Sequence, residues 1–361
     1  MFLFDAHLDL SMNAMEWNRD LREDLPEIRR REAKLTDKAD RGNGVVSFPA
    51  MRRGQIGLCV ATQIARYVKP SNPRSGWSSP EQAWAHTQAQ LAWYRAMEAD
   101  GELRQITNKS ELNNHAEAWQ QASKDEAISS KFPIGYILSL EGADSMVTLD
   151  HLTRAYEYGL RALGPAHYGP GTYAAGTGVE GGFSDRGREL LREMEQLGMI
   201  LDLTHLTDEA LTESFDRYSG PMWASHCNCR TLVPAQRQLS DEHIKLLAAR
   251  NGVVGVVFDA WMMVPNWVRG ESTPQSTQLK VEAIIEHIDH ICQITGSAKH
   301  VGIGSDLDGG YGTEQCPSDL DSIEKLQMIV SLLEARGYER EDLEGIMHGN
   351  WIEFLNTHWS D

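Results

Sequence analysis

Apolar residues in this chain are concentrated in short, nearly continuous runs separated by longer segments of mixed polarity. Runs of this length without polar alternation are typical of strands buried on both faces, as in parallel sheets. Segments with helical periodicity separate most of them. Eight runs predict strands at 1–10, 57–64, 134–140, 160–163, 198–205, 221–226, 252–258 and 300–306.

The segments between these runs carry helix and loop signals. A helix is expected from Pro80 to Asp100, where Ala, Trp and Leu recur every three or four residues and proline occupies the first turn. Further helices are expected at 185–197, 208–215, from 240 onwards, at 281–294 and at 346–355. The polar stretch after the first strand is too long for a tight turn and predicts an elaborated loop. Residues 70–80, rich in Ser, Pro and Gly, predict another loop.

Strands that alternate with helices predict the α/β class. Eight of them predict one (β/α)8 TIM barrel with extra helices, with residues 1–361 as a single domain. A chain of this length can bury a large core. The main alternative is a doubly wound open sheet, which more usually carries a Gly-rich phosphate-binding turn after its first strand. The sequence has no such turn there.

The charge and the residue composition exclude several classes of binding partner and suggest a cellular location. The chain has 34 basic and 52 acidic side chains, a net charge of −18, which argues against nucleic acid or an anionic membrane surface. No run approaches the roughly 20 apolar residues of a membrane-spanning helix, and no secretory signal pattern precedes the first strand. We therefore expect a cytoplasmic protein. Its five scattered cysteines suit reduced thiols better than disulfides.

Acid and imidazole groups stand where the predicted strands end. His7 and Asp9 lie two residues apart, so a strand would project both from one face. The C-terminal ends of barrel strands are where active sites of this fold are built. Seven unpaired groups there would carry a heavy desolvation and repulsion cost, which bound cations remove. The sequence therefore predicts a metal site among His7, Asp9, Glu141, His167, His205, His226 and Asp306.

Two metal ions fit these residues better than one. Five of the groups are strong ligands, more than one tetrahedral zinc takes while keeping an open position. A glutamate can bridge two cations about 4 Å apart, and Glu141 lies between the other ligand pairs in strand order. We expect two Zn²⁺ ions with a bridging hydroxide as the nucleophile, which is the chemistry of hydrolysis. The five ligands are His7, Asp9, Glu141, His205 and His226.

Seven segments, from the first strand to the last helix, resemble the membrane dipeptidase (renal dipeptidase) family of binuclear zinc peptidases, within the amidohydrolase-like barrels. Each segment alone is weakly specific, whereas the ordered set is highly specific. The segments are Asp5-Ala6-His7-Leu8-Asp9, Leu138-Ser139-Leu140-Glu141-Gly142, Gly182-Phe183-Ser184-Asp185-Arg186-Gly187-Arg188, Leu201-Asp202-Leu203-Thr204-His205, Ala224-Ser225-His226, Gly302-Ile303-Gly304-Ser305-Asp306-Leu307-Asp308-Gly309 and Gly349-Asn350-Trp351.

The resemblance implies how the metal ligands divide between the two ions. His7, Asp9 and Glu141 would hold one zinc. Glu141, His205 and His226 would hold the other. The chain departs from the family pattern at Leu8, at 143–144 and at 257–259. None of these departures changes one of the five ligands. These departures fall in the expected surroundings of the substrate and leave open which dipeptide is cut.

The resemblance also implies roles for four further residues. His167 would contact the substrate carbonyl and steady the developing oxyanion. Asp306 would carry a proton to the leaving amine. Arg237 would bind the free carboxylate of the substrate, for which a guanidinium fork is well suited. Arg230 is a nearby competitor for that task, and spacing alone does not separate the two arginines.

The expected function is therefore a zinc-dependent dipeptidase acting on small dipeptides. An L-D dipeptide is a candidate substrate, because family members often accept a D-residue at the C-terminal position. One alternative is another amidohydrolase on the same metal site, such as an N-acyl amino acid hydrolase or a lactonase. Another is a catalytically silent barrel acting as a binding subunit, against which the complete ligand set argues. The family often forms homodimers, and nothing in the sequence marks an interface.

Overall fold

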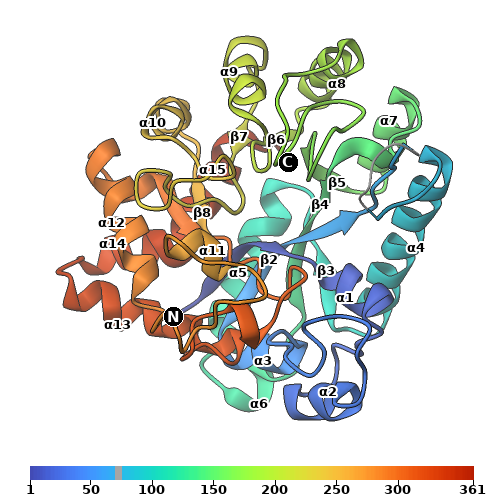
Figure 1. Ribbon diagram of the computed structural model, residues 1–361. Coiled ribbons are helices and arrows are strands. Elements are labelled where there is room, and N and C mark those ends of the chain that lie inside the picture. The colour runs from blue at the N-terminus through green and yellow to red at the C-terminus, as the bar shows by residue number, and fades with distance from the viewer. Residues whose placement is uncertain (70–74) are drawn as a thin grey trace.

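The computed structural model describes residues 1–69 and 75–361 and places parallel strands in the middle with helices around them (Figure 1). The barrel strands follow the order β7-β6-β5-β4-β2-β1-β9-β8, and an extra strand, β3 (Leu103–Gln105), pairs with the beginning of β4. The bounds of the barrel strands are β1 (Leu3–Leu8), β2 (Ile56–Ile64), β4 (Ile134–Glu141), β5 (Leu160–Gly164), β6 (Ile200–Asp202), β7 (Met222–Trp223), β8 (Val254–Val256) and β9 (Val301–Ile303).

The ring of strands is nearly closed, and a backbone bridge between Ala224 and Val254 spans its last gap, between β7 and β8. Two glycines allow this close approach. A Cβ atom on Gly255 would lie 1.9 Å from the carbonyl oxygen of Ser225, and one on Gly304 would lie 1.7 Å from it. All eight predicted strands are present, and the predicted (β/α)8 barrel is confirmed.

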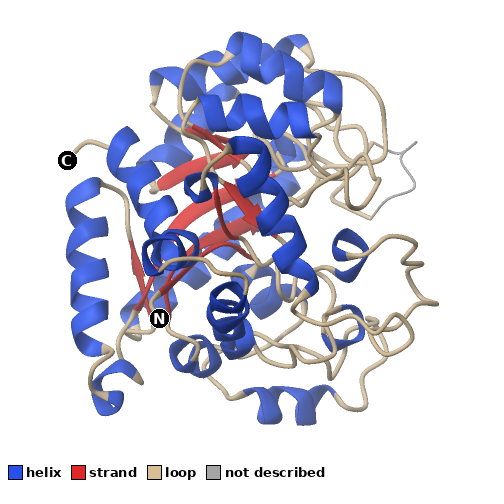
Figure 2. Ribbon diagram, turned by 90° about the vertical axis from the view of Figure 1, so that its left-hand side faces the viewer, coloured by secondary structure: helices blue, strands red, loops and turns tan. Residues whose placement is uncertain are grey.

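Helices surround the strands on the outside (Figure 2). Side-chain caps explain where several begin: Ser79, Ser184, Thr207 and Ser240 each accept a hydrogen bond from an amide in the first turn. The helices are α1 (Leu10–Glu16), α2 (Leu25–Glu32), α3 (Phe48–Arg53), α4 (Pro80–Ala99), α5 (Lys109–Ala122), α6 (Glu126–Ser129), α7 (Leu149–Glu157), α8 (Asp185–Gln196), α9 (Asp208–Arg217), α10 (Asp241–Ala249), α11 (Ala260–Met263), α12 (Ala283–Thr295), α13 (Met328–Ala335), α14 (Arg340–Glu344) and α15 (Asn350–His358). The predicted helices correspond to α4, α8, α9, α10, α12 and α15, the last preceded by a π-helical turn at Gly345–Gly349.

The core links the first strand to the end of the chain. Asp5 of β1 accepts hydrogen bonds from the backbone amide of Ser305, at 2.8 Å, and from its hydroxyl, at 2.5 Å. Behind β9, the ring of Trp351 packs where Gly302 has no side chain, because a Cβ there would lie 2.3 Å from the indole nitrogen. That nitrogen donates to the carbonyl of Ile303 at 3.1 Å. The segments at 302–309 and 349–351 therefore pack against each other, and the glycine of one makes room for the tryptophan of the other.

The elaborated loop predicted after the first strand contains α1, α2 and α3. Buried Arg19 holds this excursion together through ion pairs with Glu32 (2.9 Å) and Asp40 (3.0 Å). Arg19 also lies 3.5 Å from Asp308, whose carboxylate accepts a hydrogen bond from the amide of Val45. Removing one partner of a buried ion pair typically costs about 3–5 kcal/mol. The excursion is thus fastened to the loop that follows β9.

The last four barrel strands are shorter than predicted, because the chain leaves the sheet before reaching the polar strand-end residues. Two of those residues, His205 (φ 70°) and Asp306 (φ 55°), have left-handed backbone conformations, which side chains other than glycine seldom adopt. Such conformations cost about 1–3 kcal/mol and persist where the surrounding structure imposes them. The polar groups that follow these four strands therefore stand on loops at the barrel mouth.

The predicted loop at 70–80 lies partly outside the described residues, since residues 70–74 are not described. Residues 75–79 form neither a helix nor a regular strand, and Trp77 makes an isolated bridge to Tyr67. Within 1–69 and 75–361, no helix is both long enough and apolar enough to cross a membrane.

Candidate metal centre and substrate cavity

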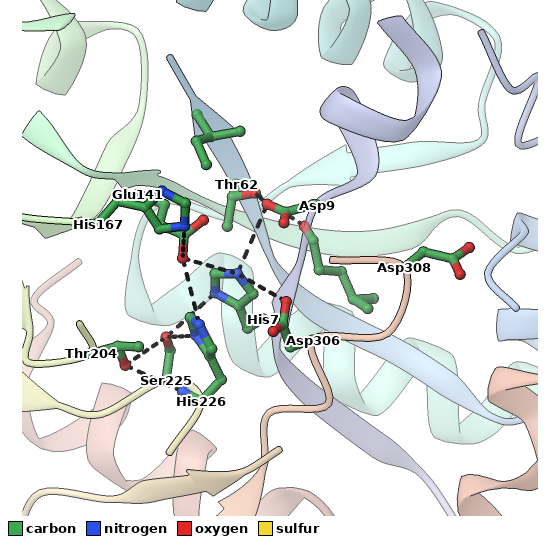
Figure 3. A network of polar contacts seen from close by, with 12 residues as sticks. His7, Asp9, Thr62, Glu141, His167, Thr204, Ser225, His226, Asp306 and Asp308 are labelled. Carbon is green, nitrogen blue, oxygen red and sulfur yellow. Dashed lines mark hydrogen bonds and ion pairs between the residues drawn. The ribbon is translucent and has the colours of Figure 1, made fainter. Parts of the chain in front are cut away.

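The five predicted metal ligands converge at the mouth of the barrel. Figure 3 shows four of them, His7, Asp9, Glu141 and His226, lying together. Oε1 of Glu141, the last residue of β4, lies 3.1 Å from Nε2 of His205 and 3.5 Å from Nε2 of His226. The same oxygen lies 3.8 Å from Nε2 of His7, which is 3.9 Å from Oδ1 of Asp9. One carboxylate oxygen of Glu141 thus lies within 4 Å of three imidazole nitrogens.

The possible ligand atoms of the described residues form three compact sets, and within each set the atoms lie within 4.8 Å of one another. These sets differ from the predicted division of the ligands into two groups of three. His167 and Asp306, predicted as substrate residues, lie close enough to belong to these sets. The sets are His7, Glu141 and His226; Glu141, His167 and His205; and His7, Asp9 and Asp306.

The imidazoles of the predicted ligands are backed by hydroxyl groups. Oγ of Ser225 lies 2.9 Å from Nδ1 of His226 and 3.4 Å from Nδ1 of His7, and Oγ1 of Thr177 lies 3.0 Å from Nδ1 of His205. A hydroxyl can accept the hydrogen of Nδ1, which leaves the Nε2 lone pair for a cation. Nε2 of His7 is buried and has no hydrogen-bond partner among the residues that the structure describes. The residues present fit a metal.

Burial sets the charge of these groups. It lowers the pKa of His7 to about 3 and the pKa values of His205 and His226 well below the usual range, so the imidazoles are neutral ligands at pH 7. Burial raises the pKa of Asp9 to about 6. Burial, with repulsion from Asp9, also holds the pKa of Glu141 well above its usual range. Bound cations would offset this crowding of carboxylates.

Asp306 stands at the edge of this centre. Its Oδ1 lies 3.9 Å from Nε2 of His7, and its backbone amide donates to the carbonyl of His7 at 3.2 Å. Burial and the nearby carboxylates of Asp9 and Glu141 raise its pKa well above the usual range. A Cβ atom on Gly309 would lie 1.9 Å from Asp306 Oδ1, so the carboxylate needs a glycine there. Asp306 is a carboxyl group able to hold and release a proton.

His167, which follows β5, faces the same centre from another side. Its Nε2 lies 3.9 Å from Oε1 of Glu141, and its ring is 4.5 Å, centre to centre, from that of His205. A guanidinium nitrogen of Arg66 makes a hydrogen bond with Nδ1 of His167. Sequence reasoning missed Arg66, which lies two residues beyond the end of β2 in no recognisable motif.

The cavity above the centre has a volume of about 240 Å³. Arg237 forms part of its wall, with hydrogen bonds to Sγ of Cys227 (3.1 Å) and to the carbonyl of His226 (2.9 Å). Arg230 is not among the described lining residues and forms an ion pair with Asp208 at 2.6 Å. The lining comprises Asp9, Glu141, His167, Tyr168, His205, His226, Arg237, Asp259, Met262, Arg269, Asp306, Gly309, Gly310, Tyr311 and Gln315.

Asp259 anchors a further wall that sequence reasoning did not assign. Its carboxylate accepts hydrogen bonds from Arg269 at 2.9 Å and from Gln315 at 2.7 Å. Among the departures from the family pattern, Asp259 lines the cavity. Leu8 and Asp144 are buried and do not belong to the described lining, so the expectation that the departures face the substrate is not met there.

The barrel and its converging imidazoles and carboxylates define a barrel metalloenzyme. The family model for membrane dipeptidases (peptidase family M19) matches residues 1–358. The chain belongs to this family, a family of metallo-dipeptidases, as the resemblance in the sequence predicted.

Two similar relatives carry dipeptidase names. An uncharacterized dipeptidase of Schizosaccharomyces pombe is 29% identical over 234 residues, which cover 64% of this chain and 53% of that protein. The dipeptidase tcpJ of Claviceps purpurea is 27% identical over 249 residues, which cover 67% of this chain and 56% of that protein. The chain thus spans about half the length of these relatives.

Two solved structures share the fold over almost the whole chain. The dipeptidase AC, a metallo peptidase of family M19, has a TM-score of 0.79 and 24% identity, covering 100% of this chain and 99% of that one. A metallo peptidase from Rhodobacter sphaeroides, liganded with a phosphinate mimic of the dipeptide L-Ala-D-Ala, has a TM-score of 0.77 and 22% identity, covering 99% of each chain. These likenesses support the barrel assignment.

Proposed function

We propose that this protein is a dipeptidase that uses two Zn²⁺ ions to hydrolyse the peptide bond of a small dipeptide. The observation that carries the proposal is the position of Glu141, whose Oε1 lies 3.1–3.8 Å from the Nε2 atoms of three histidines. Neutral imidazoles with carboxylates are the ligands that zinc sites use, and membership of the membrane dipeptidase family supplies the reaction class.

The proposed ligands of one ion are His7, Asp9 and Glu141, and those of the other are Glu141, His205 and His226. When bound, the two cations would polarise the scissile carbonyl and activate a water molecule. Their ligands come from four barrel strands or the loops directly after them, so the rigid barrel would fix the spacing of the site.

Three side chains of the cavity would act directly on the substrate. His167 would donate a hydrogen bond to the carbonyl oxygen, where negative charge develops in the transition state. Arg237 would bind the free carboxylate and so set the distance from the C-terminus to the cleaved bond. Asp306 would place a proton on the leaving amine nitrogen, which would otherwise depart as an unstable anion.

The size of the cavity favours a small substrate. Its 240 Å³ lies below the range of about 300–1,000 Å³ typical of sites for drug-sized ligands. An L-D dipeptide is our finer proposal, supported by the structural neighbour from Rhodobacter sphaeroides that is liganded with a mimic of L-Ala-D-Ala. The homodimer and the cytoplasmic location stay predictions.

A substrate panel tests the proposal. Zinc-loaded protein would be assayed on L-L and L-D dipeptides, on their N-acetylated forms and on a simple lactone. We expect cleavage of the free dipeptides alone, with the L-D to L-L ratio defining the stereochemical preference. Cleavage of acylated amino acids or the lactone alone would keep the metal site and overturn the substrate class. A protein that takes up no zinc and cleaves nothing would favour the silent barrel.

A further inference from the structure

The histidines of the cavity differ in the group that meets their Nδ1 atoms. Nδ1 of His205 meets the hydroxyl of Thr177 at 3.0 Å, and Nδ1 of His226 meets the hydroxyl of Ser225 at 2.9 Å. A hydroxyl can accept or donate a hydrogen bond. Nδ1 of His167 instead meets the guanidinium of Arg66. A guanidinium has five N–H donors and no acceptor.

This difference fixes where His167 carries its hydrogen. Because Arg66 can only donate, Nδ1 of His167 must accept, and it therefore holds a lone pair. A neutral imidazole with a lone pair on Nδ1 carries its hydrogen on Nε2. Nε2 is the atom that faces Glu141 Oε1 at 3.9 Å. The N–H group of His167 therefore points into the metal centre and the cavity.

We infer that Arg66 is a positioning residue that fixes the tautomer of His167, making this imidazole a hydrogen-bond donor and excluding it as a metal ligand. Distance alone does not separate these two roles, because His167 lies in one compact set with Glu141 and His205. A nitrogen that carries hydrogen has no lone pair in the ring plane for a cation. The inference deepens the proposed function, in which His167 donates to the substrate carbonyl.

Backbone contacts hold Arg66 in place for this task. Its carbonyl accepts a hydrogen bond from the amide of Trp77 at 2.8 Å, and the amide of Val68 donates to the carbonyl of Trp77 at 3.0 Å. A second guanidinium nitrogen lies 3.4 Å from the carbonyl of Ser75. The segments at 66–68 and 75–77 thus form a small paired unit from which the guanidinium reaches His167.

The first test reads the tautomer directly. Zinc-loaded protein with ¹⁵N-labelled histidine would be examined by two-bond ¹H–¹⁵N correlation NMR, which distinguishes a ring nitrogen that carries hydrogen from one that does not. The chain has 13 histidines, and the signal lost in His167→Gln identifies the relevant ring. We expect hydrogen on Nε2 in the wild type and in Arg66→Lys, and a mixture of tautomers in Arg66→Met. Hydrogen on Nδ1 in the wild type would overturn the inference.

The second test is a double-mutant cycle on dipeptide hydrolysis. Loss of a complete oxyanion donor costs about 10²–10³ in kcat, so we expect Arg66→Met, which only frees the ring, to lower kcat about 10-fold. KM and zinc content should stay close to the wild type, and Arg66→Lys should recover most of the loss. In a His167→Gln background, Arg66→Met should cause no further loss, because both act through one group.

Control and contrary outcomes keep the inference separate from the proposed function. Arg22→Met removes a half-exposed guanidinium paired with Asp20 and Asp100 and should leave kcat unchanged. A further 10-fold loss in the His167→Gln background, or loss of zinc in Arg66→Met, would overturn the positioning role. If the wild type cleaves no dipeptide, the proposed function fails, whereas the NMR spectra still decide the tautomer.

Discussion

The inner and outer walls of the cavity carry groups that suit ligands of opposite charge. The inner wall consists of strand-end groups that present lone pairs: Asp9, Glu141, His205 and His226 are at most 9% exposed. The outer wall includes Arg237 and Arg269, which lie on loops and present N–H groups. Lone pairs suit cations, and N–H groups suit carboxylates.

The comparison shows that the role of a side chain depends on its hydrogen-bond partner as much as on its residue type. His167 and His205 are both imidazoles within reach of Glu141. The hydroxyl behind His205 allows a lone pair to face the centre, whereas the guanidinium behind His167 makes the facing nitrogen a donor. The division implies that substitutions on the inner wall affect metal binding, and substitutions on the outer wall affect substrate binding.

The largest effect should come from Glu141→Gln, which removes the charge shared by both proposed ions. Removing a residue that only hydrogen-bonds to a metal ligand weakens metal affinity about 10–100-fold. Removing a ligand itself should therefore weaken metal affinity more than about 100-fold and abolish turnover. Metal analysis after dialysis and a dipeptide assay measure both. Chelation of the wild type should give the same loss and zinc should reverse it. Glu353→Gln, on the exposed face of α15, is the control, and retained metal in Glu141→Gln would remove Glu141 from the ligand set.

Asp306→Asn tests the boundary between the walls, because Asp306 lies 3.9 Å from His7 and yet is assigned to proton transfer. General acid–base catalysis contributes about 10²–10⁴ in rate, and we expect kcat to fall by that factor. Zinc content should stay at the wild-type level. Loss of zinc would place Asp306 among the ligands, and unchanged turnover would remove it from the mechanism.

Arg237→Met should weaken substrate binding and leave the metal centre intact. A hydrogen bond to a charged group contributes about 1.5–3 kcal/mol, which corresponds to roughly a 10- to 100-fold rise in KM for a free dipeptide. A dipeptide amide lacks the carboxylate and should be affected much less. Arg230→Met, at the ion pair with Asp208, is the matched control. Equal loss on both substrates would indicate a structural role for Arg237.

The smallest effect is expected from Arg269→Met. Its guanidinium is half exposed and paired with Asp259, and the buried Asp259 carboxylate also accepts hydrogen bonds from Trp261 and Gln315, which Arg269→Met leaves in place. A pair screened by solvent on the arginine side contributes about 1 kcal/mol or less. We therefore expect kcat/KM for a neutral dipeptide to change less than about fivefold. A loss of the size seen for Arg237→Met would show that the outer wall has a second carboxylate-binding residue.

The barrel strands and the inner wall could be predicted from sequence because both leave local signals. A strand buried on both faces needs a continuous apolar run, and a ligand at its end interrupts that run with a polar residue, as at Glu141. Exact strand ends could not be predicted. The left-handed conformations of His205 and Asp306 depend on the loops packed around them.

Several groups around the centre and the cavity had no such signal. Arg66 follows β2 without a motif, and its role depends on His167, which is 101 residues further along the chain. Asp259 was noticed as a departure from the family pattern, but its contacts with Arg269 and Gln315 arise from loops that only tertiary packing brings together. Strand β3 and helix α5 were also missed, because neither bears chemistry or a long apolar run.

The hydrogen bonds between Asp5 and Ser305 join residues that are 300 positions apart, and β1 pairs on that side with β9. While the ribosome makes the chain, the first strand therefore waits beside one neighbour until nearly all of the barrel has been synthesised. The entropy of closing such a long loop grows only with the logarithm of its length, so the delay is one of time rather than of energy. His7 and Asp9 belong to this waiting segment. A nascent chain that stops before β9 would carry all five proposed metal ligands but would lack Asp306 and the strand that completes the barrel around them.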